Sequence, residues 1–379
     1  YTLYYYDLAG NLVATVYPEG VRVLTNDQID EVQAFRNKGV NASGPIYLED
    51  QHVVKQVNSF TYNTLGEVVT SHSVDAGDSK FYYDHLGRLI VSQNAQQAVA
   101  DANNLIKYSY TGFDEIGRIV EVGEMLTRLD VPTLKHETQV KYSVVKQSFV
   151  GLALQREITK TYYDRVKFQN IQADFTQENL RPRVASVTYQ DKAGSSYDRA
   201  THYSYDVHGN VKNLIQEINA NGVTLKKRMD YDYDVASGKV NFMYYQKNQP
   251  DQFIHKFEYD GDNRIVKVFT SRDAITWDRD AKYDYYAHGL LAQSTIGNHD
   301  VESNTYAYTI QGWIKGVNGN SFSYALGYFN DGVHQDYQGI GGASNYTLST
   351  PIAESGLADD KSLFNGNIAT MASKTPQFA

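Results

Sequence analysis

The chain has 379 residues, a formal net charge of −9 and no cysteine. The acidic balance disfavours binding to nucleic acid or to anionic lipid, which require a basic face, and the lack of cysteine excludes disulfides, thiolate metal sites and cysteine nucleophiles. No apolar run approaches the roughly 20 residues that span a bilayer. The 32 tyrosines and 28 glycines predict many short strands joined by glycine turns, because tyrosine packs well on a pleated sheet and glycine favours turns.

The opening run from Tyr1 to Tyr6 reads as the middle of a strand, which indicates a fragment of a longer chain. A seven-residue pattern starts at the end of this run. It consists of Tyr6, Asp7, two variable residues, Gly10, a polar residue and an aliphatic residue. We expect residues 1–379 to form a single continuous segment built on this pattern.

The pattern recurs along the whole chain. Full copies are Tyr83–Leu89 with Asp84 and Gly87, Phe113–Ile119 with Asp114 and Gly117, and Tyr205–Val211 with Asp206 and Gly209. Degenerate copies are 62–68, 285–291, 308–314 with Gly312, 233–240 with one extra residue, and 259–265, where Tyr259 and Asp260 are followed by Asn263 in the glycine position.

Each copy predicts a tight β-hairpin turn. The aspartate side chain can accept hydrogen bonds from backbone N–H groups two residues on, and the two variable residues fit the helical corners of a type I turn. Glycine then takes the left-handed conformation that closes a bulged hairpin. Asn263 fits the same place, since asparagine tolerates that conformation better than other non-glycine residues.

The spacing of the copies predicts stacked hairpins. From Tyr205 onward the motif tyrosines recur every 23 to 28 residues, which leaves room for two strands and a return turn. Equivalent tyrosines would lie about 10 Å apart, at about 4.8 Å per strand, with aliphatic residues such as Leu89 or Val211 filling between them. No single hairpin could bury its face alone, so the stack would form the core.

Several segments interrupt the rhythm. Residues 25–39 place Ile29, Val32 and Phe35 at helical spacing and predict a helical insertion. Residues 171–180 before Pro182 predict a short helix or an ordered loop. Residues 329–360 are rich in glycine, serine and asparagine and predict a long loop, and residues 361–379 read as the truncated start of a further repeat.

No residue pattern indicates catalysis or a cofactor. Asp230, Asp232 and Asp234 resemble the start of a calcium loop, but Val235 stands where that loop needs glycine, so a solvated acidic face is the better reading. The pair Asp260 and Asp262 fails the same test. The histidines of the turns occupy variable, exposed positions: His85, His208 and His288. We predict no metal ligand, no cofactor and no catalytic residue.

The repeated motifs resemble the tyrosine–aspartate (YD) repeats of the rearrangement-hotspot (RHS) family, which includes bacterial polymorphic toxins, C components of insecticidal toxin complexes and teneurins. The resemblance covers roughly residues 1–370. Near the end, Gly312-Trp313-Ile314-Lys315 and residues 364–369 resemble RHS proteins of bacteria that use type 9 secretion. The resemblance to the RHS family implies an all-β fold in which antiparallel hairpin repeats spiral into a hollow shell. In the family a self-cleaving domain follows the shell, and this chain has no motif that matches that domain.

Three functional hypotheses stand, of which the first is the one that the resemblance implies. The first is a structural shell, secreted or at a bacterial cell surface, that encapsulates a C-terminal toxin or effector polypeptide. The second is an adhesion protein exported by type 9 secretion that binds carbohydrate or a partner cell, with secretion machinery as a further partner. Tyrosines buried as repeat spacers are favoured over a sugar site. The third is an enzyme with an unrecognised site in the long loop.

Overall fold

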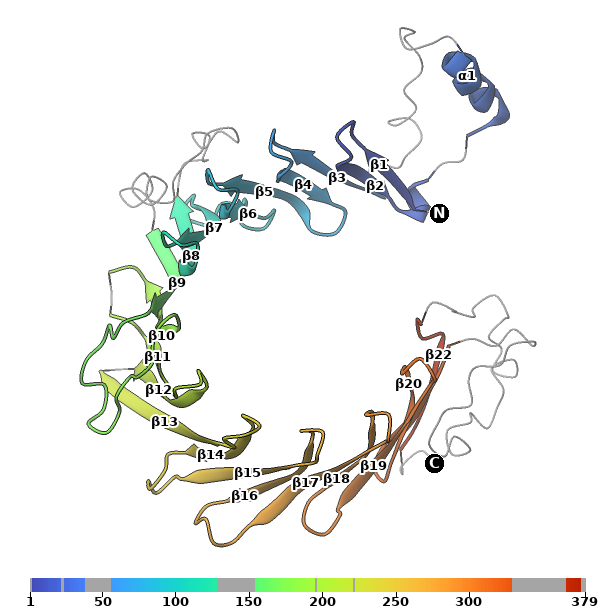
Figure 1. Cartoon of the computed structure of the whole chain (residues 1–379). Helices are drawn as coiled ribbons and strands as arrows, with labels where there is room; N and C mark the ends of the chain where they lie inside the picture. Colours follow the sequence, from blue (N-terminus) through green and yellow to red (C-terminus); the bar gives the residue numbers. More distant parts are fainter. Residues whose placement is uncertain are drawn as a thin grey trace. The chain divides into compact units, whose positions relative to one another are not determined.

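Figure 1 shows the computed structural model of the chain, which describes residues 2–21, 24–37, 56–127, 154–194, 196–220, 222–328 and 366–375. These ranges contain 22 strands, one α-helix and one 3-10 helix, η1 (Pro18–Gly20). The predicted all-β architecture of antiparallel hairpins is confirmed. The chain separates into two compact units, Tyr1–His202 with Gln216–Leu225 and Tyr203–Ile215 with Lys226–Ala379.

The first unit is an antiparallel meander in which each strand pairs with the next one along the chain, up to β11. Its strands are β1 (Leu3–Tyr6), β2 (Leu12–Val16), β3 (Val57–Tyr62), β4 (Val68–Ser73), β5 (Gly77–Tyr83), β6 (Leu89–Gln93), β7 (Ile106–Phe113), β8 (Ile119–Thr127), β9 (Leu154–Tyr163) and β10 (Val184–Lys192). Residues of β11 (Arg199–Tyr205), β12 (Val211–Ala220) and β13 (Val223–Tyr233) are divided between the two units.

The second unit continues the same plan, with consecutive antiparallel pairing from β13 to β22. Its further strands are β14 (Val240–Tyr245), β15 (Phe253–Tyr259), β16 (Ile265–Ser271), β17 (Asp278–Tyr285), β18 (Leu291–Ile296), β19 (Glu302–Tyr308), β20 (Ile314–Gly319), β21 (Ser323–Gly327) and β22 (Thr370–Lys374).

Alternation along the strands determines which side chains share a face. On β13, Tyr231 and Tyr233 lie on one face with their ring centroids 6.3 Å apart. Asp230 and Asp232 lie on the other face, where Arg228 forms an ion pair with Asp230 at 2.7 Å. In the first unit a cluster of fully or nearly buried side chains packs on β5 to β8: Tyr82, Ile90, Val91, Tyr108, Tyr110 and Met125.

The insertions differ in structure. Helix α1 (Asn26–Asn37) lies within the segment where a helical insertion was predicted, and it begins with reciprocal capping between Thr25 and Gln28. Residues 164–183, between β9 and β10, form the ordered loop of the two alternatives, with Ile171, Phe175 and Leu180 buried. The predicted loop 329–360 lies outside the described residues, and of 361–379 only 366–375 are described. No helix in the described ranges is long and apolar enough to cross a bilayer.

Candidate functional site

The motif aspartate organises each hairpin turn through its side chain. In the turn between β5 and β6, Asp84 Oδ1 accepts hydrogen bonds from the backbone N–H groups of Leu86 at 2.9 Å and Arg88 at 3.0 Å. The backbone N–H of Gly87 donates to the carbonyl of Asp84 at 3.0 Å. The same side-chain contacts recur in the turns that begin at Asp7, Asp114 and Asp260. The turn is therefore specified within one copy of the motif.

The glycine position has a left-handed backbone in every motif turn. The φ angles are 88° at Gly10, 74° at Gly87, 89° at Gly117, 100° at Gly209 and 86° at Gly312. Asn263, which replaces glycine, has a φ of 64°. In the turn after Tyr83, the N–H of Gly87 and the carbonyl of Arg88 both bond to Asp84, which is the two-against-one bulge that a left-handed residue introduces into a hairpin. A second register shift of one residue lies beside the motif tyrosine: Tyr83 pairs with Leu89, but Tyr82 pairs with Val91.

Burial and hydrogen bonding act in opposite directions on the turn carboxylates. Desolvation alone would raise the pKa of Asp84, Asp114 and Asp206. Hydrogen bonds from the side chain and the backbone of the residue four positions later outweigh it, so the pKa of each carboxyl group is lowered. The three carboxylates are therefore held in the charged form that the turn uses.

The motif tyrosine connects its hairpin to the preceding one. The hydroxyl of Tyr83 donates to the carbonyl of Val68 at 2.9 Å, and Val68 is the aliphatic residue that ends the previous motif. We call this contact the tyrosine joint. Six further joints follow the same rule: Tyr62 to Leu12 at 2.7 Å, Tyr163 to Ile119 at 2.9 Å, Tyr233 to Val211 at 2.9 Å, Tyr259 to Val240 at 2.8 Å, Tyr285 to Ile265 at 2.8 Å and Tyr328 to Ile314 at 2.6 Å.

Two of these joints involve tyrosines that the sequence pattern did not reveal. Tyr163 ends β9 and is followed by the loop 164–183, and Tyr328 follows β21, whose partner β22 begins at Thr370. Both tyrosines occupy the motif position, but an insertion stands where the tight turn and its glycine would be. The dipeptide Tyr163-Asp164 was a usable signal, since it repeats the start of the motif.

An arginine directly after the left-handed turn residue makes a second connection. Its guanidinium stacks on the aromatic ring of the next motif: Arg88 on Phe113 at 4.6 Å, Arg118 on Tyr163 at 4.2 Å and Arg264 on Tyr285 at 4.6 Å. The Nε–H of each arginine also donates to the aspartate of its own turn, at 2.7–2.8 Å. The guanidinium thereby fills the space between neighbouring turns with a stacked, charge-paired group.

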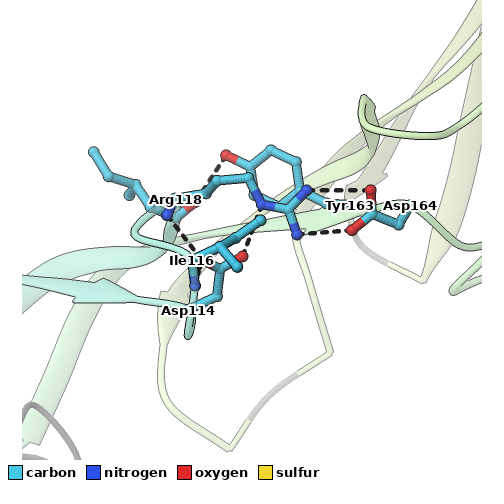
Figure 2. A network of polar contacts seen from close by, with 6 residues as sticks. Asp114, Ile116, Arg118, Tyr163 and Asp164 are labelled. Carbon is cyan, nitrogen blue, oxygen red and sulfur yellow. Dashed lines mark hydrogen bonds and ion pairs between the residues drawn. The ribbon is translucent and has the colours of Figure 1, made fainter.

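Arg118 forms the most extensive of these connections (Figure 2). Its Nη1 and Nη2 donate to the two carboxylate oxygens of Asp164 at 3.1 and 2.7 Å, in addition to the bond from Nε to Asp114. These hydrogen bonds raise the pKa of Arg118 above its usual value and lower the pKa of Asp164 below its usual value. Because Asp164 begins the loop 164–183, Arg118 fixes the start of this insertion against the preceding turn.

A buried polar cluster in the first unit has the residue types of a hydrolase triad. His202 Nδ1 lies 2.9 Å from Ser186 Oγ, and His202 Nε2 lies 3.6 Å from Glu217 Oε2. Tyr197 donates to Glu217 at 2.5 Å, and burial together with this bond raises the pKa of Tyr197. Ser186 and His202 have no exposed surface, and the ring of Phe168 from the inserted loop packs edge-on against His202 at 5.3 Å.

Both side chains are fully buried, and the contacts among Ser186, His202 and Glu217 link strands β10, β11 and β12. Sequence reasoning missed this cluster because its members come from separate strands and share no motif. The exposed turn histidines lie where they were predicted, with the side chain of His208 66% exposed. Within the described ranges no group of histidine, aspartate and glutamate side chains is arranged to hold a metal ion.

Comparisons with known proteins agree with this geometry. Residues 1–101 match a family model described as teneurin YD-shell. The chain resembles the crystal structure of TcdB2–TccC3 without its hypervariable C-terminal region, with a TM-score of 0.51 and 15% identity over 86% of this chain and 13% of that one. The crystal structure of TcdB2–TccC3–TEV matches with a TM-score of 0.50 and 13% identity, over the same shares. No curated protein sequence matches the chain significantly.

At this level of identity the structural likeness shows the fold alone, and the chain spans 13% of the length of those toxin-complex chains. The predicted resemblance to the YD-repeat family is confirmed by the family model and the shared fold.

Proposed function

We propose that this chain forms part of the shell of a large secreted RHS-repeat protein and encloses a C-terminal toxin or effector polypeptide. The observation that carries the proposal is the tyrosine joint, which bonds seven motif tyrosines to the preceding motif in addition to the backbone ladder. A wall made of repeated, laterally bonded hairpins resists local opening, because an opened hairpin loses contacts on both sides.

The comparisons support the same proposal. The family model that matches residues 1–101 is described as a shell, and the similar TcdB2–TccC3 structure lacks a C-terminal region described as hypervariable. A constant wall around a variable polypeptide would account for that description. Secretion from a bacterial cell is part of the proposal, since an enclosed toxin has to leave the cell that makes it.

Limited proteolysis of the longest reading frame that contains this chain tests the proposal. The purified protein is digested under native conditions, and fragments are identified by mass spectrometry. We expect the polypeptide that follows the repeats to survive at protease concentrations that degrade the same polypeptide fused to an unrelated carrier. Equal rates of cleavage in the two settings would contradict encapsulation. A reading frame that ends in a surface-anchoring domain would favour the adhesion hypothesis instead.

A further inference from the structure

The space between two neighbouring turns of the second unit is open where other turns fill it with arginine. The residue after Gly209 is Asn210, whose amide donates to Asp206 Oδ2 at 2.9 Å. Asn210 thus bonds to the aspartate of its own turn, as the arginines Arg88, Arg118 and Arg264 do in theirs. Its shorter side chain ends there and does not extend over the next motif ring as a guanidinium does.

A groove of about 480 Å³ occupies this space. Its walls include Asp206, Asn210, Tyr233 and Asp234, together with Tyr231 beside Tyr233 on the same face of β13. The hydroxyl of Tyr233 is held by the tyrosine joint to Val211, which fixes the ring at the edge of the groove. The groove is therefore built from a fixed aromatic platform between two turn carboxylates.

The groove has the same residue types at the same motif positions as the surroundings of Arg118. That guanidinium lies over Tyr163, the next motif tyrosine, and contacts two carboxylates, Asp114 of its own turn and Asp164 directly after the tyrosine. In the groove the corresponding residues are Tyr233, Asp206 and Asp234. The recognition elements for a guanidinium are present, and the side chain that would supply it is an asparagine.

We propose that this groove binds an arginine side chain presented by another polypeptide segment. Stacking on Tyr233 and charge pairing with Asp206 and Asp234 would recognise the planar guanidinium, which combines both interactions better than an ammonium does. Two further titratable side chains line the groove. The ammonium of Lys212 repels a bound cation, and His208 lies 4.0 Å from Asp206. The two carboxylates, Asp206 and Asp234, outnumber the single ammonium.

The adjacent groove of about 510 Å³ shares Asp234 and is lined by the motif tyrosine Tyr259, but its second carboxylate is not available in the same way. Its carboxylate at Glu258 already pairs with Lys256 at 2.9 Å and with Lys267 at 3.5 Å. The arginine site is therefore specific to the turn that carries Asn210. If the proposed function is correct, the enclosed polypeptide is the segment that supplies the arginine, so the identity of the partner rests on that proposal. The binding of arginine itself can be measured on this chain alone.

Saturation-transfer NMR with the full chain and N-acetyl-arginine amide as the probe tests the inference. We expect saturable binding with a dissociation constant on the order of 1–10 mM, as for one stacked and partly exposed ion-pair contact. N-acetyl-lysine amide is expected to bind at least about threefold more weakly. No saturable binding of the arginine probe, or equal binding of both probes, would overturn the assignment.

Three variants locate the site. N210R places a tethered guanidinium in the groove and is expected to weaken probe binding at least about fivefold by competition. D234N removes one carboxylate and is expected to weaken it about threefold; its turn should survive, since Asn63 has the same position and role in another motif turn. N103R, at an exposed asparagine in the turn between β6 and β7, adds the same charge elsewhere and should leave binding unchanged.

Circular dichroism confirms that each variant is folded. If N210R and N103R bind the probe equally, the groove is not the site. Loss of arginine binding with intact protease protection in the longer protein would leave the proposed function standing, whereas loss of protection alone would leave the arginine site standing.

Discussion

Replacement of the turn glycine at Gly87 by valine gives the most direct test of the repeat. The φ of Gly87 is 74°, a conformation that costs an L-residue roughly 1–2 kcal/mol, and a β-branched side chain is tolerated there least well. A Cβ at Gly87 would also lie 2.6 Å from Glu67 Oε1. Glu67 accepts a hydrogen bond from Asn63 at 2.6 Å, so displacing it costs about 0.5–1.5 kcal/mol more. We expect a total of about 1.5–3.5 kcal/mol.

Gly10 separates the two contributions. Its φ is 88°, but no atom lies within 4 Å of a Cβ placed there, so Gly10→Val should show the backbone strain alone, about 1–2 kcal/mol. His85→Val changes an exposed variable position of the same turn as Gly87 and should be nearly silent.

Hydrogen exchange followed by mass spectrometry measures these effects locally, in the hairpins β5–β6 and β1–β2. A destabilisation of about 1.5–3.5 kcal/mol makes opening of the hairpin about 10- to 300-fold more frequent, since each 1.4 kcal/mol is tenfold. Equal exchange in Gly87→Val and His85→Val would refute the assignment of the glycine to a strained turn position. Equal effects at Gly87 and Gly10 would refute only the role of Glu67.

Three further outcomes are expected. Tyr259→Phe removes the hydroxyl that donates to Val240 and should destabilise hairpin β15–β16 by about 0.5–1.5 kcal/mol, measured by hydrogen exchange, whereas Phe113→Tyr should increase protection by supplying a hydroxyl that this joint lacks. Arg118→Lys cannot form the bidentate contact with Asp164 and should increase proteolytic cleavage within 164–183; unchanged cleavage would show that other contacts hold the loop. The pKa of Asp84 is lowered from 3.8 in the fold, so the unfolded chain binds more protons, and the stability that Asp84 contributes is complete above about pH 4 and is lost as the pH falls through the lowered value. Asp84→Asn should therefore flatten the acid limb of an unfolding curve followed by circular dichroism, and an unchanged limb would contradict the charged turn.

Much of the fold follows from the sequence because the turn is a local structure. Aspartate, glycine and the two residues between them make their hydrogen bonds within five positions, as Asp84 and Arg88 do. The motif therefore predicts a hairpin wherever it occurs. Asn263 is left-handed like the glycines it replaces, so the glycine position of the motif reflects the steric requirement of a left-handed backbone. The antiparallel architecture follows from repeating such hairpins.

Contacts between hairpins were beyond sequence reasoning. The tyrosine joint connects residues that are 14 to 50 positions apart, with separations set by insertions of unrelated length, as between Tyr62 and Leu12. The aliphatic residue was expected to pack between rings, but its carbonyl also accepts a hydrogen bond from the next tyrosine. The buried cluster of Ser186, His202 and Glu217 likewise requires three strands to be in register.

The groove beside Asn210 shows most clearly which features follow from the sequence and which require the folded chain. The order of residues alone places an asparagine after Gly209 and a tyrosine–aspartate pair at 233–234. Only the tertiary structure brought Asp206, Tyr233 and Asp234 around one opening. The physical reason is that turn geometry is governed by steric limits on a few consecutive residues, whereas the distance between two turns depends on how complete strands pair.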